Sequence, residues 1–209
     1  MQAERGAAIH LDLPFYRQHW DFTCGPASLM MAMKYLDDGV HPDRDLEIDI
    51  WREATFVAAP GTSRYGLAYA AAVRGFSARA TSSTGGIDFQ ERLVSILDAP
   101  DLQLLRDQFA ERRARCSRLG VRDRQGTITG DTIRRSLERG HVPLIVTSAL
   151  FYCDDDLPHG VAVTGMDDAF LFFNSPDDAW PQRRRIALAA LETFIGYHGD
   201  QSMVEVWRG

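Results

Sequence analysis

One cysteine in this 209-residue chain stands where a helix is expected to begin. After Cys24, apolar residues recur at helical spacing as far as about Asp38, and Gly39 follows where a helix would end. Pro26 suits the first helical turn, where its missing N–H is not needed. Unpaired N–H groups and the positive end of the helix dipole favour a thiolate, which is the nucleophilic form of cysteine. The pattern therefore predicts Cys24 as a candidate nucleophile for acyl transfer.

The neighbours of Cys24 strengthen this interpretation. A lone cysteine near a helix start is more often a small buried hydrophobic residue than a nucleophile. Gly25, however, leaves room for a substrate backbone beside the helix end. Gln18, six residues before Cys24, offers an amide donor of the kind that a developing oxyanion requires. The plainer alternative for Gln18 is a loop glutamine that bonds to the backbone.

Three blocks of this sequence resemble a known family. Residues 14–18 together with 24–27 resemble the signature of the bacteriocin-leader-processing, double-glycine cysteine peptidases. Residues 158–168 resemble the strand that carries the histidine of that family, and residues 172–176 fall where its third catalytic residue lies. These bacterial enzymes are papain-like domains that are often fused to peptide-exporting transporters, and this chain is most similar to the stand-alone, transporter-free members. The resemblance implies a papain-like fold and a thiol hydrolase without a cofactor.

The resemblance also assigns roles to three side chains. It implies that Cys24 attacks the substrate, that His159 moves the proton and that Gln18 builds the oxyanion hole. Among the six histidines, His159 has the best independent claim, because it begins a strand of small and apolar residues after a loop. A structural histidine is the alternative for this position.

The third member of the site is less clearly defined. Related peptidases place an aspartate immediately before the proline of the third block, and this chain has Ser175 there. Papain-like enzymes also use asparagine to orient the histidine, which favours Asn174. Successive strand residues point to opposite faces, so Asn174 and Ser175 face the same site only if the strand has already ended. We expect Asn174 to orient His159, with Asp177 and Ser175 as the alternatives.

The elements expected to position these residues divide the chain into two parts. Apolar periodicity and turn residues predict helices first and an antiparallel sheet later, which is an α+β arrangement. We expect one papain-like domain over residues 1–209, with a helical lobe at about 10–140 and a sheet lobe at about 141–209. The predicted helices are 24–38, 43–54, 65–74, 101–119, 129–140 and 186–197, and the predicted strands are 76–81, 142–147, 159–166, 170–173 and 204–206.

Composition excludes several classes of function. A net charge of −6 argues against nucleic acid as a partner, and no apolar run is long enough for a membrane span. Residues 1–10 lack the basic start and apolar core of a signal peptide. The three cysteines, Cys24, Cys116 and Cys153, are typical of reduced thiols in a cytoplasm. A homo-oligomer is left open.

An acidic loop before His159 is a second feature of interest. Cys153 is followed by Asp154, Asp155 and Asp156, but no second Cys or His pair completes a tetrahedral metal set. We therefore expect no metal. We expect these aspartates to lie at the rim of the cleft and to favour a cationic or amine-bearing substrate.

Three functions fit these residues. The first is a cytoplasmic cysteine peptidase or amidohydrolase, whose substrate, by resemblance, is a peptide with small residues such as glycine before the scissile bond. The second is an acyltransferase or amide-forming enzyme, in which an amine replaces water at the thioester. The third is a non-catalytic peptide-binding module, which the missing family aspartate favours. Hydrolysis and aminolysis use the same residues, so product analysis is needed to separate them.

Overall fold

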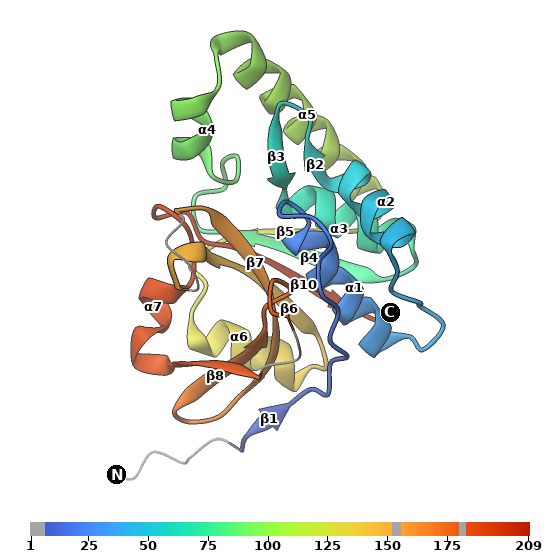
Figure 1. The fold of residues 1–209 in the computed structure, drawn as a ribbon, viewed down its shortest axis with the longest axis vertical. Helices are drawn as coiled ribbons and strands as arrows, with labels where there is room; N and C mark the ends of the chain where they lie inside the picture. The colour runs from blue at the N-terminus through green and yellow to red at the C-terminus, as the bar shows by residue number, and fades with distance from the viewer. Residues whose placement is uncertain (1–6, 152–155, 180–182) are drawn as a thin grey trace.

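The computed structural model describes residues 7–151, 156–179 and 183–209. Helices α1 to α5 come from the first part of the chain and lie together in Figure 1, whereas α6 and α7 lie at the other side of the sheet. The helices are α1 (Cys24–Leu36), α2 (Arg44–Ala54), α3 (Arg64–Val73), α4 (Gln90–Ile96), α5 (Ala99–Arg118), α6 (Gly130–Glu138) and α7 (Leu191–Phe194), with 3-10 turns η1 (Ala149–Phe151) and η2 (Leu188–Ala190).

Within the described residues, one large sheet has the strand order β5-β4-β10-β6-β7-β8-β9, and β1 pairs with β7 beside this path. A separate hairpin joins β2 and β3. The pairings of the large sheet are antiparallel except that of β4 with β5, which is parallel. The strands are β1 (Ile9–His10), β2 (Thr55–Phe56), β3 (Ala59–Thr62), β4 (Ser77–Ser82), β5 (Arg122–Gln125), β6 (Val142–Ser148), β7 (Pro158–Met166), β8 (Phe170–Asn174), β9 (Arg184–Ala187) and β10 (Ser202–Trp207).

The core has two parts, one on each face of the sheet. Leu144 and Val204 belong to the part covered by α1, α2, α3 and α5. Their strand neighbours Ile145 and Met203 belong to the part covered by α6 and α7. This separation follows from the alternation of side chains along a strand. The central strands are therefore apolar on both faces.

The predicted α+β class is confirmed, but the two halves are less segregated than expected. Strands β4 and β5 come from the part predicted to be helical, and both join the large sheet. Residues 121–126 were expected to form a loop, yet they contain β5, whose residues are all exposed. A fully exposed edge strand has no alternation of apolar residues for a sequence pattern to detect. Residues 186–197 were expected to form one helix, but they contain the end of β9, then η2 and α7.

A short, buried contact joins α1 to the sheet. The residues of α1 from Gly25 to Met33 are all buried, and α1 packs against β7. A side-chain carbon added at Gly160 of β7 would lie 3.4 Å from the backbone nitrogen of Gly25. The beginning of the helix and the beginning of the strand are thus neighbours. Among the described residues, no helix is long and apolar enough to cross a membrane.

Candidate active site

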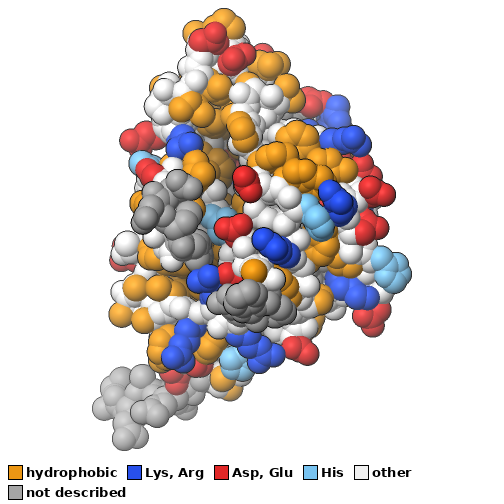
Figure 2. Space-filling model, in the orientation of Figure 1, with side chains coloured by type: hydrophobic (Ala, Val, Ile, Leu, Met, Phe, Trp, Pro, Cys, Tyr) orange, Lys and Arg blue, Asp and Glu red, His pale blue; other side chains and the backbone are white. Residues whose placement is uncertain are grey.

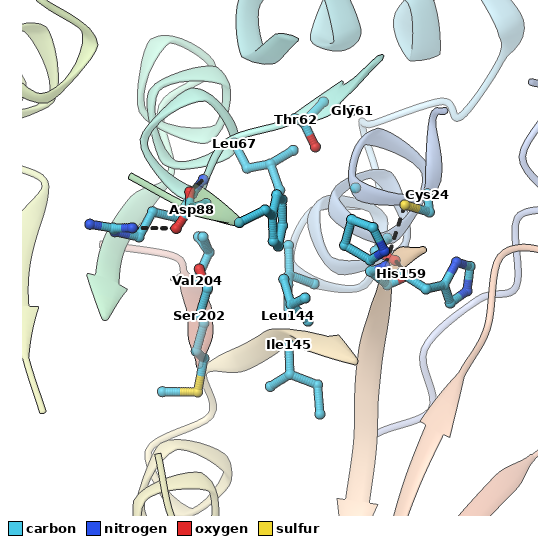
Figure 3. Close-up of a pocket in the computed structure, with 18 of the residues that line it drawn as sticks. Cys24, Gly61, Thr62, Leu67, Asp88, Leu144, Ile145, His159, Ser202 and Val204 are labelled. Carbon is cyan, nitrogen blue, oxygen red and sulfur yellow. Dashed lines mark hydrogen bonds and ion pairs between the residues drawn. The ribbon is translucent and has the colours of Figure 1, made fainter. Parts of the chain in front are cut away.

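Cys24 is the first residue of α1, and its sulfur meets the start of β7. The backbone N–H of Gly160 donates to Cys24 Sγ over 3.3 Å. The carbonyl of the same glycine accepts from Ser28 Oγ, one turn along α1, at 3.2 Å. Gly160 is therefore held to the helix by both of its backbone polar groups. This clamp places His159, the residue before Gly160, at the same end of the cleft as the Cys24 sulfur (Figure 3).

Burial of Cys24 acts against the thiolate that the start of the helix was expected to favour. Burial raises the pKa of the thiol above its ordinary value of 9.0, although the backbone N–H groups of Gly160, Gly25 and Cys24 itself act to lower it. Removal of water from the sulfur thus outweighs the donors at the helix N-terminus. In the substrate-free protein, these effects favour the neutral thiol.

His159 is buried and also favours its neutral form. Burial lowers its pKa to about 4, because the charged imidazolium loses its hydration. Asp177 and Asp178 act to raise this pKa, and Arg184 acts to lower it. His159 Nε2 lies 3.0 Å from Ser175 Oγ. This contact is made by a hydroxyl, which brings no charge.

This contact is made by Ser175, which was an alternative to the expected Asn174, while the amide of Asn174 lies elsewhere. Asn174 is the last residue of β8 and pairs with Ala162, on the face of the sheet that α1 covers. Its amide nitrogen lies 3.8 Å from the sulfur of Met31 in α1. Ser175 follows the strand and points to the histidine instead. The alternation of side chains along the strand separates the two residues, and Ser175 is the one at the site.

The third predicted alternative, Asp177, is exposed in the turn after β8. The N–H of Asp178 donates to the carbonyl of Ser175 over 3.2 Å, which closes this turn. Asp178 itself is buried and accepts from Arg184 Nε at 2.8 and 2.9 Å. The charge of Asp178 is therefore paired with Arg184, while Asp177 acts on His159 through its electric field.

Gln18 lies in the loop before α1, and it contacts both the segment that leads into Cys24 and the segment that follows Ser175. Its backbone N–H donates to the carbonyl of Pro176, next to Ser175, at 2.8 Å. Its side-chain Nε2 donates to the carbonyl of Trp20 at 3.1 Å. This bond is the local backbone contact that the plainer interpretation of Gln18 expected. Nε2 has a second hydrogen, which this bond leaves for another acceptor.

A narrow cleft of about 60 Å³ runs from Cys24 and His159 between the helices and the sheet (Figure 3). Its walls are mainly apolar and include Leu67, Leu144 and Val204. On the same measure, a space of about 10–15 Å³ is enough to hold one water molecule. The space beside the two candidate catalytic residues therefore suits small groups.

Gly25 lines this cleft for a different reason from the one predicted. A Cβ at Gly25 would lie 2.4 Å from Thr62 Oγ1 and 3.1 Å from the nearest Leu67 methyl carbon. The space beside its Cα is filled by the chain itself, so the missing side chain allows β3 and α3 to approach α1.

The family model of the Peptidase C39-like family matches residues 13–192. This match covers most of the chain and includes Gln18, Cys24, His159 and Ser175. The chain belongs to the C39-like peptidase family.

One solved structure agrees with this assignment at the level of the fold, and a second is reported beside it. A C39-like peptidase from Bacillus anthracis has 14% sequence identity and a TM-score of 0.53, with 98% of this chain and 99% of that chain covered. A double-glycine-motif protease from an AMS/PCAT transporter, in complex with the leader peptide, has 15% identity and a TM-score of 0.49, with 98% and 99% covered. No curated protein sequence matches the chain. The family match and the Bacillus anthracis structure confirm the predicted α+β peptidase fold.

In this C39-like peptidase, the structure describes one of the three aspartates of the acidic loop. Asp154 and Asp155 lie outside the described residues, as does Cys153. Asp156 is described, and its carboxylate lies 2.8 Å from His198 Nε2. Asp156 lines a separate hollow with His198 and is not among the described residues that line the cleft of Cys24. Nor does any group of three or more His, Cys, Asp and Glu residues in the described ranges have the arrangement of a metal site.

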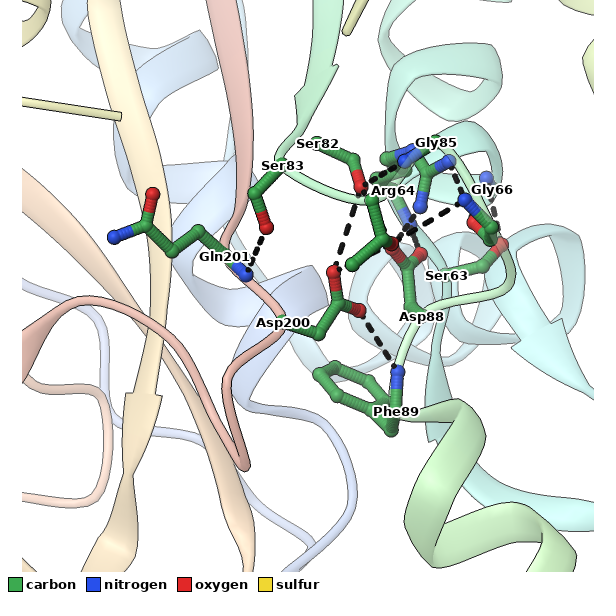
Figure 4. Close-up of polar contacts among 12 residues, drawn as sticks. Ser63, Arg64, Gly66, Ser82, Ser83, Gly85, Asp88, Phe89, Asp200 and Gln201 are labelled. Atoms are coloured by element: carbon green, nitrogen blue, oxygen red, sulfur yellow. Dashed lines mark hydrogen bonds and ion pairs between the residues drawn. The ribbon is translucent and has the colours of Figure 1, made fainter. Parts of the chain in front are cut away.

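Sequence reasoning missed a buried ion pair in the cleft wall. Arg64 and Asp88 each have a side chain that is 1% exposed, and Arg64 Nη1 donates to the Asp88 carboxylate. The carboxylate also accepts the backbone N–H of Arg64 at 2.7 Å, and Arg64 Nη2 donates to the carbonyl of Gly86 at 2.8 Å (Figure 4). The two residues are 24 positions apart, and no local pattern links them. Asp88 lies at the end of the cleft away from Cys24 (Figure 3).

A shallow apolar hollow lies outside the cleft, near Cys24. Phe22, Trp51, Val57 and Pro60 line it, and Pro60 also lines the cleft. Figure 2 shows hydrophobic side chains gathered over the β2–β3 hairpin, where this hollow lies. The surface beside the candidate nucleophile is therefore apolar.

Proposed function

We propose that this C39-like peptidase cleaves a peptide or amide bond through a thioester on Cys24, with His159 as the general base. The observation that carries the proposal is the clamp at Gly160, which joins the nucleophile on α1 to the histidine on β7. A nucleophile needs a base nearby and a third group that orients the base. Cys24 has the side chain of a nucleophile, His159 that of a base, and Ser175 is the group that contacts the base.

The proposed reaction has two steps. Cys24 Sγ bonds to the substrate carbonyl carbon while His159 accepts the thiol proton, and the C–N bond then breaks as His159 returns the proton to the leaving nitrogen. Water next attacks the thioester, which releases the acid and restores the thiol. We assign the proton transfer to the imidazole of His159, whose Nε2 lies against Ser175 Oγ. Neutral Cys24 and neutral His159 are the correct starting forms for this transfer.

We assign oxyanion stabilisation to the amide of Gln18 and the backbone N–H of Cys24. One such donor typically lowers the barrier by about 3 kcal/mol. The bond from Gln18 to the Trp20 carbonyl holds the amide in one orientation, and its second N–H is the proposed donor.

The cleft also bears on the substrate. Its volume of about 60 Å³ and its apolar walls favour small side chains such as glycine next to the scissile bond. We therefore propose a peptide with small residues before that bond. We further propose a cytoplasmic location, because the mechanism needs Cys24 as a reduced thiol.

The test is incubation with a peptide library, with products and enzyme adducts identified by mass spectrometry. We expect cleaved peptides and an acyl adduct on Cys24, and neither with Cys24→Ala or His159→Ala. Cys116 is an internal control, because it is buried and burial raises its thiol pKa to about 12. Conjugates formed only after addition of an amine would instead support acyl transfer. Tight peptide binding without any product would support the non-catalytic module.

A further inference from the structure

The loop that carries Gln18 and leads into Cys24 converges on one carboxylate, that of Glu47 in α2. Glu47 Oε1 accepts the backbone N–H of His19 at 2.9 Å and the hydroxyl of Thr23 at 2.5 Å. Glu47 Oε2 accepts the hydroxyl of Tyr16 at 2.9 Å and lies 2.8 Å from His19 Nδ1. Four polar groups of one short segment therefore meet a side chain that is 24 to 31 residues away in the chain.

The burial of Glu47 makes these contacts strong constraints. Its side chain is 0% exposed, whereas that of His19 is 37% exposed. A buried carboxylate is tolerated only when hydrogen bonds or an opposite charge replace its hydration. Within the described residues, the groups that do so for Glu47 come from this loop. The position of the loop is thus tied to the position of α2.

The contacts lie immediately next to both candidate catalytic groups. His19 follows Gln18, so Glu47 fixes the peptide unit that joins Gln18 to His19. Thr23 precedes Cys24 and is the N-cap residue of α1. A threonine at this position usually accepts a backbone N–H of the first turn, but the hydroxyl of Thr23 points to Glu47 and to the carbonyl of Trp20 instead.

The carbonyl of Trp20 completes the connection. It accepts the backbone N–H of Thr23 and Gln18 Nε2, each at 3.1 Å. It also lies 2.8 Å from Thr23 Oγ1, whose single hydrogen is shared between this carbonyl and Glu47. Glu47 holds Thr23, Thr23 holds this carbonyl, and the carbonyl holds the amide of Gln18. A displacement at Glu47 would therefore reach the amide proposed to stabilise the oxyanion.

We propose that Glu47 is a positioning residue that sets the Gln18 amide and the Cys24 sulfur relative to each other. The inference rests on the proposed function, because it needs both groups to take part in the reaction. Glu47 is not among the described residues lining the cleft, so it acts through His19 and Thr23 and not on the substrate. No motif marks it in the sequence, where it is one of several acidic residues of an amphipathic helix.

The test is Glu47→Gln in the full-length chain, which keeps the size of the side chain but puts an amide donor opposite groups that donate. We expect the rate of Cys24 alkylation by iodoacetamide to fall at least fivefold. For a peptide obtained from the library, we expect kcat to fall at least tenfold with KM changed less than threefold. A purely structural role would lower the melting temperature without this separation of kcat from KM.

The matched control is Glu205→Gln. Glu205 is also a buried carboxylate, with a side chain 3% exposed, but it pairs with Arg79 and His141 on a different part of the sheet. We expect its variant to stay within twofold of the wild-type alkylation rate. If Glu47→Gln does not fold, Thr23→Val is the deciding variant, because it removes one donor to Glu47 without changing the carboxylate. Its alkylation rate should fall at least twofold.

These experiments distinguish a failure of the positioning role from a failure of the proposed function. The positioning role would be overturned if folded Glu47→Gln had wild-type kinetics. If Glu47→Gln does not fold, wild-type kinetics in Thr23→Val would overturn it instead. Either result would leave the proposed function intact. If wild-type Cys24 reacts no faster than Cys116, and His159→Ala changes nothing, the proposed function fails and this inference fails with it.

Discussion

His159 Nε2 lies 3.0 Å from Ser175 Oγ, at a position where related peptidases have a carboxylate. A hydroxyl can fix the orientation of the imidazole, but it cannot stabilise the imidazolium by charge. Burial therefore dominates and lowers the pKa of His159 to about 4. The Ser175 hydroxyl can orient the base, but it does not itself supply a charge that would favour a resting thiolate–imidazolium pair.

Replacing Ser175 by aspartate should restore that charge. In Ser175→Asp, the carboxylate next to Nε2 should raise the pKa of His159 by at least one unit, because an adjacent opposite charge favours the imidazolium. We expect alkylation of Cys24 at pH 6 to 7 to become about tenfold faster as the thiolate becomes more populated. NMR titration of the His159 ring and alkylation rates across pH would measure both effects.

Ser175→Ala is the control for this substitution, because it removes the contact without adding charge. We expect it to slow alkylation, since the imidazole loses its orientation. An unchanged His159 titration in a folded Ser175→Asp protein would contradict the assignment of Ser175 to this site.

The low pKa of His159 also predicts how stability depends on pH. The unfolded chain binds a proton at this residue below about 6.5, but the folded protein does so only below about 4. Between these values the unfolded state holds more protons, so the free energy of unfolding should fall as the pH falls. The loss should approach about 3 kcal/mol near pH 4, at 1.36 kcal/mol per pKa unit.

Urea unfolding between pH 7 and 4 would measure this loss, with His159→Gln as the reference that cannot titrate. The wild-type protein should lose more stability than the variant, with the difference appearing between pH 6.5 and 4. Parallel pH curves for the two proteins would show that His159 is not held neutral by burial.

The sequence was most informative for features that depend on interactions within a few consecutive residues. The helix start at Cys24 and the apolar strand after His159 each have a pattern within a few residues, and both elements were predicted near their observed positions. The choice between Asn174 and Ser175 depended on where β8 ends, and strand ends have no strong local signal. That is why the sequence favoured Asn174, whereas the structure places the alternative, Ser175, against His159.

Contacts between distant parts of the chain were beyond sequence reasoning. Glu47 meets the loop at Thr23, and Arg64 meets Asp88, in each case over 24 residues. Each pair combines ordinary charged or polar residues, and only folding shows that they are buried together. Strand β5 was missed because its residues are exposed and therefore show no apolar alternation.

Gly25 should not tolerate a side chain. In Gly25→Ala, the new Cβ would lie 2.4 Å from Thr62 Oγ1, so β3 or α1 must shift. Overpacking of this kind typically costs about 1–3 kcal/mol, and the shift should also slow alkylation of Cys24. Urea unfolding and iodoacetamide kinetics would measure the two effects.

A second substitution tests the cause. Thr62→Ala removes the hydroxyl that the new methyl group would meet, so Gly25→Ala combined with Thr62→Ala should regain at least half of the lost stability. Thr62→Ala by itself is the reference for the loss of the hydroxyl. A double variant no better than Gly25→Ala would place the conflict elsewhere, for example at Leu67.

The ion pair of Arg64 and Asp88 should be costly to break on one side. In Asp88→Asn, the guanidinium keeps its burial but loses the opposing charge, and such a change typically costs about 3–5 kcal/mol. Replacing both partners by apolar residues, Arg64→Met with Asp88→Leu, should cost much less, because no charge is then left buried.

The exposed pair of Arg52 and Asp49 is the control, and Asp49→Asn should change stability by less than about 1 kcal/mol. Urea unfolding of these variants gives the comparison. If Asp88→Asn were as mild as Asp49→Asn, the cleft wall would be open to water at the ion pair, and its low exposure would not describe the protein in solution.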